Sequence, residues 1–122
     1  MATSKIPVND KRIGYTHTGA ELTSFYNETL ENGKTAVFNV SGSFRAVMTI
    51  DTGYGGGAGG KGMYILAFSS SGNGGKADIF TASDVTITLG SNTISLVNAT
   101  GYRTWVNFLV MNGSLDGVTI SP

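Results

Sequence analysis

Residues 84–113, DVTITLGSNTISLVNATGYRTWVNFLVMNG, contain three short apolar runs separated by small polar residues. In the first run Val85, Ile87 and Leu89 alternate with threonines, so one face of the segment is apolar and the other is polar. This period of two is typical of a β-strand with one buried face. Glycine and asparagine between the runs favour tight hairpin connections. The stretch therefore predicts neighbouring antiparallel strands.

Runs of the same kind extend outward in both directions from this stretch. They are short, rich in β-branched and aromatic residues, and bounded by glycine, serine and asparagine. The complete set is 34–40, 43–50, 62–69, 77–81, 84–89, 92–97, 102–111 and 117–120. About eight short strands in a chain of 122 residues predict an all-β fold, either an antiparallel β-sandwich or a jelly roll.

The N-terminal part of the chain has a different pattern. Residues 1–19 are polar and weakly patterned, which predicts an extended arm ahead of one β-sandwich domain at 20–122. Apolar residues within 20–31 recur at helical spacing, and Gly33 is placed to end a helix, so a short helix is predicted there. Threonine and aromatic residues in the same segment favour a strand as the alternative.

The run 102–111 is apolar on both faces. Trp105, Leu109 and Met111 occupy its odd-numbered face, and the even-numbered face is apolar as well. Because a sandwich covers only the inner face of a strand, the second face needs another cover. The N-terminal arm, the predicted helix and a neighbouring subunit are the candidates. Trp105, Leu109 and Met111 are therefore candidate residues of an oligomer interface.

Charge and hydropathy exclude several classes of function. Lys plus Arg equals Asp plus Glu, at 8 each, and this balance argues against a nucleic-acid partner. No run approaches the roughly 18 apolar residues of a membrane helix, so membrane insertion is not expected. Residues 1–12 lack the hydrophobic core of a signal peptide, so the chain is expected to be made without one.

The low charge content also bears on assembly. Only 13% of the residues are charged, against about 25% in an average protein. This favours a surface that is partly covered by copies of the chain or by a partner. The alternative is that the abundant small polar residues keep the surface hydrated.

The glycine-rich segment 51–68, DTGYGGGAGGKGMYILAF, resembles a phosphate-binding loop without meeting its requirements. Residues 55–61 match seven positions of the P-loop pattern, but the eighth must be Ser or Thr and here is Gly62. A strand follows the glycines, whereas phosphate binding needs the N-terminus of a helix. We therefore expect the loops 53–62 and 72–75 to be flexible connections or binding rims.

The sequence lacks the residues that a catalytic site or a metal site would need. There is no cysteine, and His17 is the only histidine, so no zinc site, metal site or other cofactor is expected. Four aspartates near strand ends could supply the carboxylate pair of a glycosidase, but aspartate there is ordinary turn chemistry, so no enzyme is predicted. These aspartates are Asp51, Asp78, Asp84 and Asp116.

Aromatic side chains in loops offer a ligand-binding alternative. An aromatic ring can stack on the apolar side of a sugar, while neighbouring polar groups bind the hydroxyls. Tyr64 and Trp105 lie within strands and are expected in the core. The candidate ligand-binding residues are Tyr54 and Asn73 in the two glycine loops, and Tyr102 with Arg103 beside a hairpin.

The segments KTAVFNVSGSFRAVMTI and DVTITLGSNTISLVNATGYRTWVNFLVMNG resemble the β-sandwich head domains of bacteriophage tail fibres and receptor-binding proteins. The resemblance covers residues 34–120. It implies a non-enzymatic adhesive protein of the virion, made in the host cytoplasm, that forms a homotrimer. It also implies binding to carbohydrate or protein on the host cell surface.

Two alternatives remain beside this resemblance. Tail fibres carry a long shaft before the head, whereas about 33 residues precede the matching region here. A capsid-decorating or head-fibre protein, held to other virion proteins by residues 1–19, is therefore the first alternative. The second is a soluble carbohydrate-binding module that acts as a monomer, like a lectin.

Overall fold

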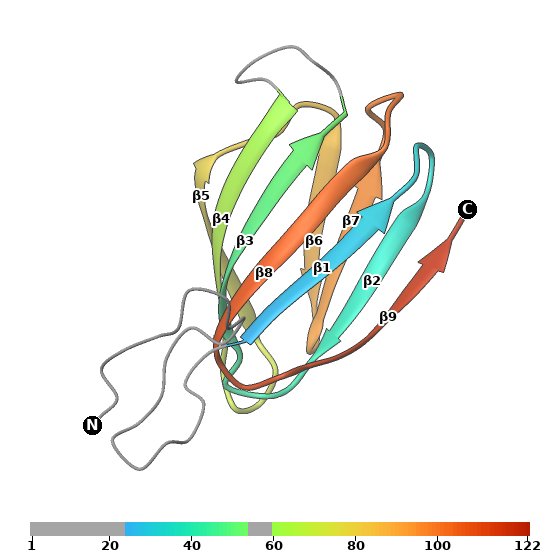
Figure 1. The fold of residues 1–122 in the computed structure, drawn as a ribbon. Helices are drawn as coiled ribbons and strands as arrows, with labels where there is room; N and C mark the ends of the chain where they lie inside the picture. The colour runs from blue at the N-terminus through green and yellow to red at the C-terminus, as the bar shows by residue number, and fades with distance from the viewer. Residues whose placement is uncertain (1–23, 54–59) are drawn as a thin grey trace, which may run out of the picture.

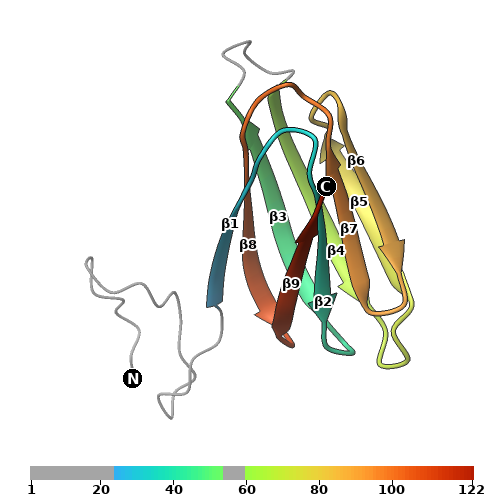
Figure 2. The same ribbon diagram turned by 90° about the vertical axis from the view of Figure 1, so that its right-hand side faces the viewer.

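The computed structural model describes residues 24–53 and 60–122, and in these ranges nine strands form two antiparallel sheets (Figures 1 and 2). The strands are β1 Ser24–Leu30, β2 Thr35–Val40, β3 Arg45–Thr52, β4 Lys61–Phe68, β5 Gly74–Phe80, β6 Val85–Gly90, β7 Thr93–Asn98, β8 Thr104–Asn112 and β9 Leu115–Ser121. The described residues contain no α-helix. The predicted all-β sandwich is thus confirmed.

The helix predicted at 20–31 is wrong for the residues that the structure describes. Strand β1 instead pairs with β8 along its whole length, from Ser24 opposite Val110 to Leu30 opposite Thr104. The aromatic and β-branched residues of this segment suit a strand, and the exposed edge of β8 offers a ladder of hydrogen bonds. Long-range pairing therefore overrides the local helical spacing. The predicted arm at 1–19 lies outside the described residues.

The order of strands decides which loops share an end of the sandwich. One sheet has the order β1-β8-β3-β4-β5, and the other has the order β6-β7-β2-β9. Strands β3, β4 and β5 form a meander, so the C-terminal end of β3 and the β4–β5 connection lie at opposite ends of the sandwich (Figure 1). The end of the sandwich at which β3 finishes also carries the β1–β2 and β7–β8 connections (Figure 1).

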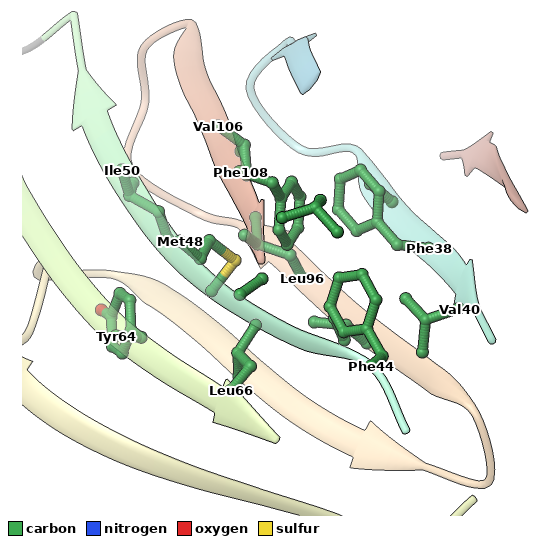
Figure 3. Packing of buried hydrophobic residues seen from close by; sticks show 14 of the residues in the cluster. Phe38, Val40, Phe44, Met48, Ile50, Tyr64, Leu66, Leu96, Val106 and Phe108 are labelled. Atoms are coloured by element: carbon green, nitrogen blue, oxygen red, sulfur yellow. The ribbon is translucent and has the colours of Figure 1, made fainter. Parts of the chain in front are cut away.

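The core lies between the sheets and is built from alternate residues of each strand. Phe38 of β2 and Phe108 of β8 pack edge to face, with ring centroids 4.9 Å apart. Figure 3 shows Met48, Ile50 and other side chains of β3, β4 and β8 meeting those of β2 and β7. Tyr64 is buried as predicted, and its hydroxyl oxygen accepts a hydrogen bond from the Ala82 backbone at 3.0 Å.

Strand β8 has one face in the core and one face on the outside of the sheet. Its even-numbered residues Val106, Phe108 and Val110 are buried between the sheets. Trp105 is 40% exposed, so the expectation that it is a core residue is wrong. Alternation along the strand places Trp105 on the outer face of the five-stranded sheet.

Candidate functional site

The loop between β7 and β8 is fixed in place by a buried asparagine. Asn98, the last residue of β7, is fully buried. Its Nδ2 group donates to the carbonyl oxygens of Leu30 at 2.9 Å and of Tyr102 at 2.8 Å. Its Oδ1 atom accepts from the backbone and the hydroxyl group of Thr100, at 3.1 and 2.7 Å. All polar atoms of this side chain are therefore used to hold the β7–β8 loop against the end of β1.

Neighbouring loops add further bonds at the same end. The Asn32 Oδ1 atom accepts from the Gly101 backbone at 2.7 Å. The Arg103 Nε group donates to Glu31 Oε2 at 3.0 Å, so the β1–β2 turn is bound to the β7–β8 loop twice. The Gly53 amide donates to the Arg103 carbonyl oxygen at 2.7 Å and so attaches the end of β3 as well.

These bonds hold two partly exposed aromatic side chains beside one glycine. Tyr102 is 49% exposed and Trp105 is 40% exposed. A Cβ atom built on Gly53 would lie 3.6 Å from Tyr102 Cβ and 3.7 Å from Trp105 Cζ3. We call Tyr102, Arg103 and Trp105, together with Glu31 and Gly53, the aromatic rim.

Polar side chains surround the tryptophan of the rim. In the sheet register Trp105 lies between Thr29 of β1 and Asp51 of β3. Asp51 forms an ion pair with Lys61 on the adjacent strand β4. An exposed aromatic ring among hydroxyl, carboxylate and ammonium groups can stack on an apolar sugar face and bind the surrounding hydroxyls. The geometry thus offers the chemistry of a carbohydrate-binding surface.

The structure brings together only some of the ligand-binding residues predicted from the sequence. Tyr102 and Arg103 are adjacent in the rim. Asn73 lies in the β4–β5 loop at the opposite end of the sandwich, where its backbone exchanges hydrogen bonds with Ser69. No single small site can therefore contain all three residues. Tyr54 lies outside the described residues, although it follows Gly53 directly.

Trp105 lies in the rim, whereas its sequence context predicted a core or interface residue. Both faces of its strand are apolar, so local pattern alone does not say which face is inner. The available signal was Arg103 and Asn107, polar residues that share the odd-numbered face with Trp105. Trp105 was predicted as an interface residue, and it does lie on the outer sheet face that the interface prediction concerned.

The outer face of the five-stranded sheet carries a second candidate surface. Five successive cross-strand partners, one from each strand, form an apolar line across it. We call this set the apolar row, and its members in order are Phe25, Leu109, Val47, Ile65 and Ala77. Phe25 is 58% exposed and Ile65 is 44% exposed.

The predicted interface residues relate to this row in different ways. Leu109 lies within it, whereas Trp105 and Met111 lie toward the two ends of the same face of β8. Strand β1 lies beside β8 in the sheet rather than over it (Figure 1), so the suggestion that a helix covers this face is wrong. Within 24–53 and 60–122, no strand or loop covers the row.

Residues 24–53 and 60–122 contain neither a metal-binding cluster nor a membrane-spanning helix. No group of three or more His, Cys, Asp or Glu residues there could hold a metal ion. No helix in these ranges is long and apolar enough to cross a membrane.

Comparison with known proteins gives one informative similarity. No protein-family model and no curated protein matches the sequence. Among solved structures, the fold is similar to part of the tailspike protein gp49 from Acinetobacter baumannii bacteriophage Fri1, a capsular polysaccharide depolymerase. The TM-score is 0.52 and the identity is 19%, and the match covers 81% of this chain but only 19% of the tailspike chain. The sandwich is thus a fold that occurs as one part of a phage tailspike.

Proposed function

We propose that this chain is a bacteriophage virion protein of the tail-fibre or receptor-binding type, which attaches to carbohydrate on the host surface as a homotrimer. The aromatic rim is the observation that carries the proposal, because it presents Tyr102 and Trp105 together at one end of the sandwich. The shared fold with part of a phage tailspike supports the assignment to the virion.

The rigidity of the rim favours binding. The loop that carries Tyr102 is held by the buried Asn98 amide, and Arg103 is bonded to both Glu31 and Gly53. Side chains that are already positioned lose less conformational entropy when a ligand binds. Tyrosine and tryptophan also offer a large contact area with few rotatable bonds.

The charged groups at the rim favour binding over cleavage. A glycosidase needs two carboxyl groups that face one glycosidic bond, one of them acting as an acid. At the rim, Glu31 is paired with Arg103, and Asp51 is paired with Lys61. Both carboxylates are thus engaged by cations, an arrangement that suits recognition of hydroxyl groups. We therefore propose that the chain holds polysaccharide without cutting it.

The test is binding to a panel of purified capsular and O-antigen polysaccharides, measured by biolayer interferometry. The variant Tyr102→Ala should lose at least about tenfold in affinity for any polysaccharide that the wild type binds, which corresponds to about 1.4 kcal/mol. Ile120→Ala is the matched control, since Ile120 is 44% exposed but lies on β9, an edge strand of the other sheet. Equal affinity of wild type and Tyr102→Ala would remove the rim assignment. Release of new reducing ends would show an enzyme.

A soluble monomeric carbohydrate-binding module would use the same rim. The apolar row favours the assembled virion protein over this alternative, since a monomer gains nothing from exposing Phe25 and Ile65 on one sheet face. The solution mass of the chain discriminates between the two functions.

A further inference from the structure

We propose that the aromatic rim binds neutral polysaccharides, which are built from uncharged sugar units, and discriminates against acidic ones. The inference rests on the proposed function, because the site concerned is the proposed carbohydrate site. It deepens that function by naming the class of sugar and the residues that determine it. These residues are two carboxylates at the rim and beside it, Glu31 and Asp51.

Two ion pairs lie close to the aromatic side chains of the rim. Asp51 is the cross-strand partner of Trp105 on β3, and it pairs with Lys61 on β4. Arg103 precedes Trp105 by two residues, and its Nε group donates to Glu31 Oε2 at 3.0 Å. All four charged side chains are about half exposed. A ligand that stacks on the aromatic rings would therefore meet both pairs.

Each ion pair presents hydrogen-bond donors beside hydrogen-bond acceptors. The contact between Arg103 and Glu31 uses one nitrogen of the guanidinium group and one of the two carboxylate oxygens. Lys61 likewise contacts one of the two oxygens of Asp51. A sugar hydroxyl group both donates and accepts, whereas an ionised carboxylate only accepts. The ion pairs are therefore complementary to hydroxyl groups, and their acceptor atoms have nothing to offer an acidic group.

An acidic sugar would compete with a carboxylate that is already in place. The chain itself holds Glu31 beside Arg103, so an incoming carboxylate would have to displace it. Exposed ion pairs contribute little, so the exchange of one carboxylate for another gains almost nothing. The displaced Glu31 would then lie near the new anion, and the two like charges would repel each other. This repulsion decides the balance against an acidic sugar, whereas a neutral sugar leaves the ion pair intact.

The other charges at this end of the sandwich provide no positive surplus. The Asn98 and Ala99 amides donate to the carbonyl oxygens of Lys34 and Asp84, which places one cation and one anion beside the β7–β8 loop. The sequence 54–59, between β3 and β4, contains no charged residue. Over the described ranges, this end therefore lacks the excess of cations that attracts a polyanion.

The aromatic side chains favour the same class of ligand. The face of an aromatic ring carries a negative partial charge, which suits the C–H groups of a sugar ring and disfavours a carboxylate. Tyr102 and Trp105 are both partly exposed at the rim. Binding by stacking and by neutral hydrogen bonds should also respond weakly to salt, in contrast to binding between opposite charges.

The experiment compares polysaccharides that differ only in charge. Acidic capsular polysaccharides are used in their native form and after chemical reduction of their carboxyl groups to alcohols, and naturally neutral polysaccharides are added to the panel. Biolayer interferometry measures binding of the wild-type chain. We expect the native acidic form to bind at least about tenfold more weakly than its reduced form. Affinity for a neutral polymer should change by less than about twofold between about 0.05 M and about 0.5 M NaCl.

Two variants of similar shape test the carboxylates. Glu31→Gln and Asp51→Asn each retain an acceptor oxygen but remove the negative charge. Each should raise the affinity for a native acidic polymer by at least about threefold, with a smaller effect on its reduced form. Asp116→Asn is the matched control, because it removes the same charge from the start of β9, where Asp116 accepts from the Ser114 hydroxyl group at 2.6 Å. It should leave both affinities unchanged.

The outcomes separate this inference from the proposed function. Tighter binding of native acidic polymers than of their reduced forms, lost in Tyr102→Ala, would overturn the neutral class and support the rim. An equal gain in Asp116→Asn and Glu31→Gln would show that overall charge sets the preference, and would overturn the role of the two carboxylates. Binding of neutral polymers that Tyr102→Ala leaves unchanged would overturn the rim, and no binding to any polysaccharide would overturn the proposed function. This inference would fall in both of these cases.

Discussion

The side-chain amide of Asn98 donates a hydrogen bond of 2.8 Å to the carbonyl oxygen of Tyr102, and so links the buried end of β7 to the exposed rim. The same nitrogen donates to the carbonyl oxygen of Leu30 at 2.9 Å. One side chain thus joins both sheets and the β7–β8 loop. Asn98 therefore contributes both to the stability of the sandwich and to the shape of the candidate site.

Asn98→Ala is expected to lower both stability and ligand affinity. The change removes a donor from the carbonyl oxygens of Leu30 and Tyr102 and should cost about 2–4 kcal/mol of unfolding free energy. Urea denaturation measures this loss, and polysaccharide binding at a temperature where the variant is folded measures the effect on the rim. The exposed Asn39→Ala is the control and should change stability by less than about 0.5 kcal/mol. Equal unfolding free energies of the wild type and Asn98→Ala would contradict the role given to Asn98.

Gly53→Ala is expected to disturb the rim because the added methyl group would crowd Arg103. The added Cβ atom would lie 3.0 Å from the Arg103 carbonyl oxygen, which is the acceptor of the Gly53 amide. Crowding of this kind costs about 1–3 kcal/mol and should move Tyr102 relative to Trp105. Polysaccharide affinity and the urea midpoint measure the two effects. The matched control is Gly75→Ala, whose Cβ would meet nothing within 4 Å, and it should leave both quantities unchanged.

Much of the fold follows from the sequence because most strands carry their own pattern. The alternation of Val85, Ile87 and Leu89 fixes both the type of the element and its buried face, whatever the partner strand. The segment 24–30 has no such pattern of its own, since its aromatic residues fit a helix and a strand equally well. Its conformation is decided by the exposed edge of β8, which is distant in sequence.

The candidate site was harder to predict from the sequence, because the order of the strands determines which of its residues lie together. Tyr102 and Arg103 are recognisable from their position beside a hairpin. The separation of Asn73 from them depends on the order of strands, which no local pattern encodes. The role of Asn98 has no local signal either, since its partner Leu30 lies 68 residues away.

Replacing two buried threonines with valine is expected to stabilise the protein. Thr52 and Thr104 are cross-strand partners, and neither hydroxyl group has a hydrogen-bond partner among the described residues. A buried hydroxyl without a partner is destabilising, and valine has nearly the same shape. The double variant should gain about 1 kcal/mol or more in urea denaturation. Thr88→Val, on the hydrated face, should change stability by less than about 0.5 kcal/mol. A double variant that is less stable than the wild type would show that these hydroxyls do have partners.

The stability of the sandwich should fall in alkaline solution because of Tyr26. Burial, the hydrogen bond to Glu28 and the negative charge of Glu28 together raise the pKa of Tyr26 from 10.0 to about 12. Between about pH 10 and about pH 12 the folded protein therefore retains the Tyr26 proton, which the unfolded chain has already lost. Unfolding therefore releases a proton there, and the unfolding free energy decreases as the pH rises from about 10 to about 12.

Tyr26→Phe isolates this contribution. The variant retains the ring that packs against Phe38 and Phe108 at centroid distances of 6.2 Å, but it has no group to titrate. The difference in unfolding free energy between wild type and variant should be constant from about pH 7 to about pH 9. Above about pH 10 this difference should shift in favour of the variant. Urea denaturation across this range provides the measurement, and a difference that stays constant throughout would mean that the hydroxyl of Tyr26 has the same pKa in the folded and the unfolded chain.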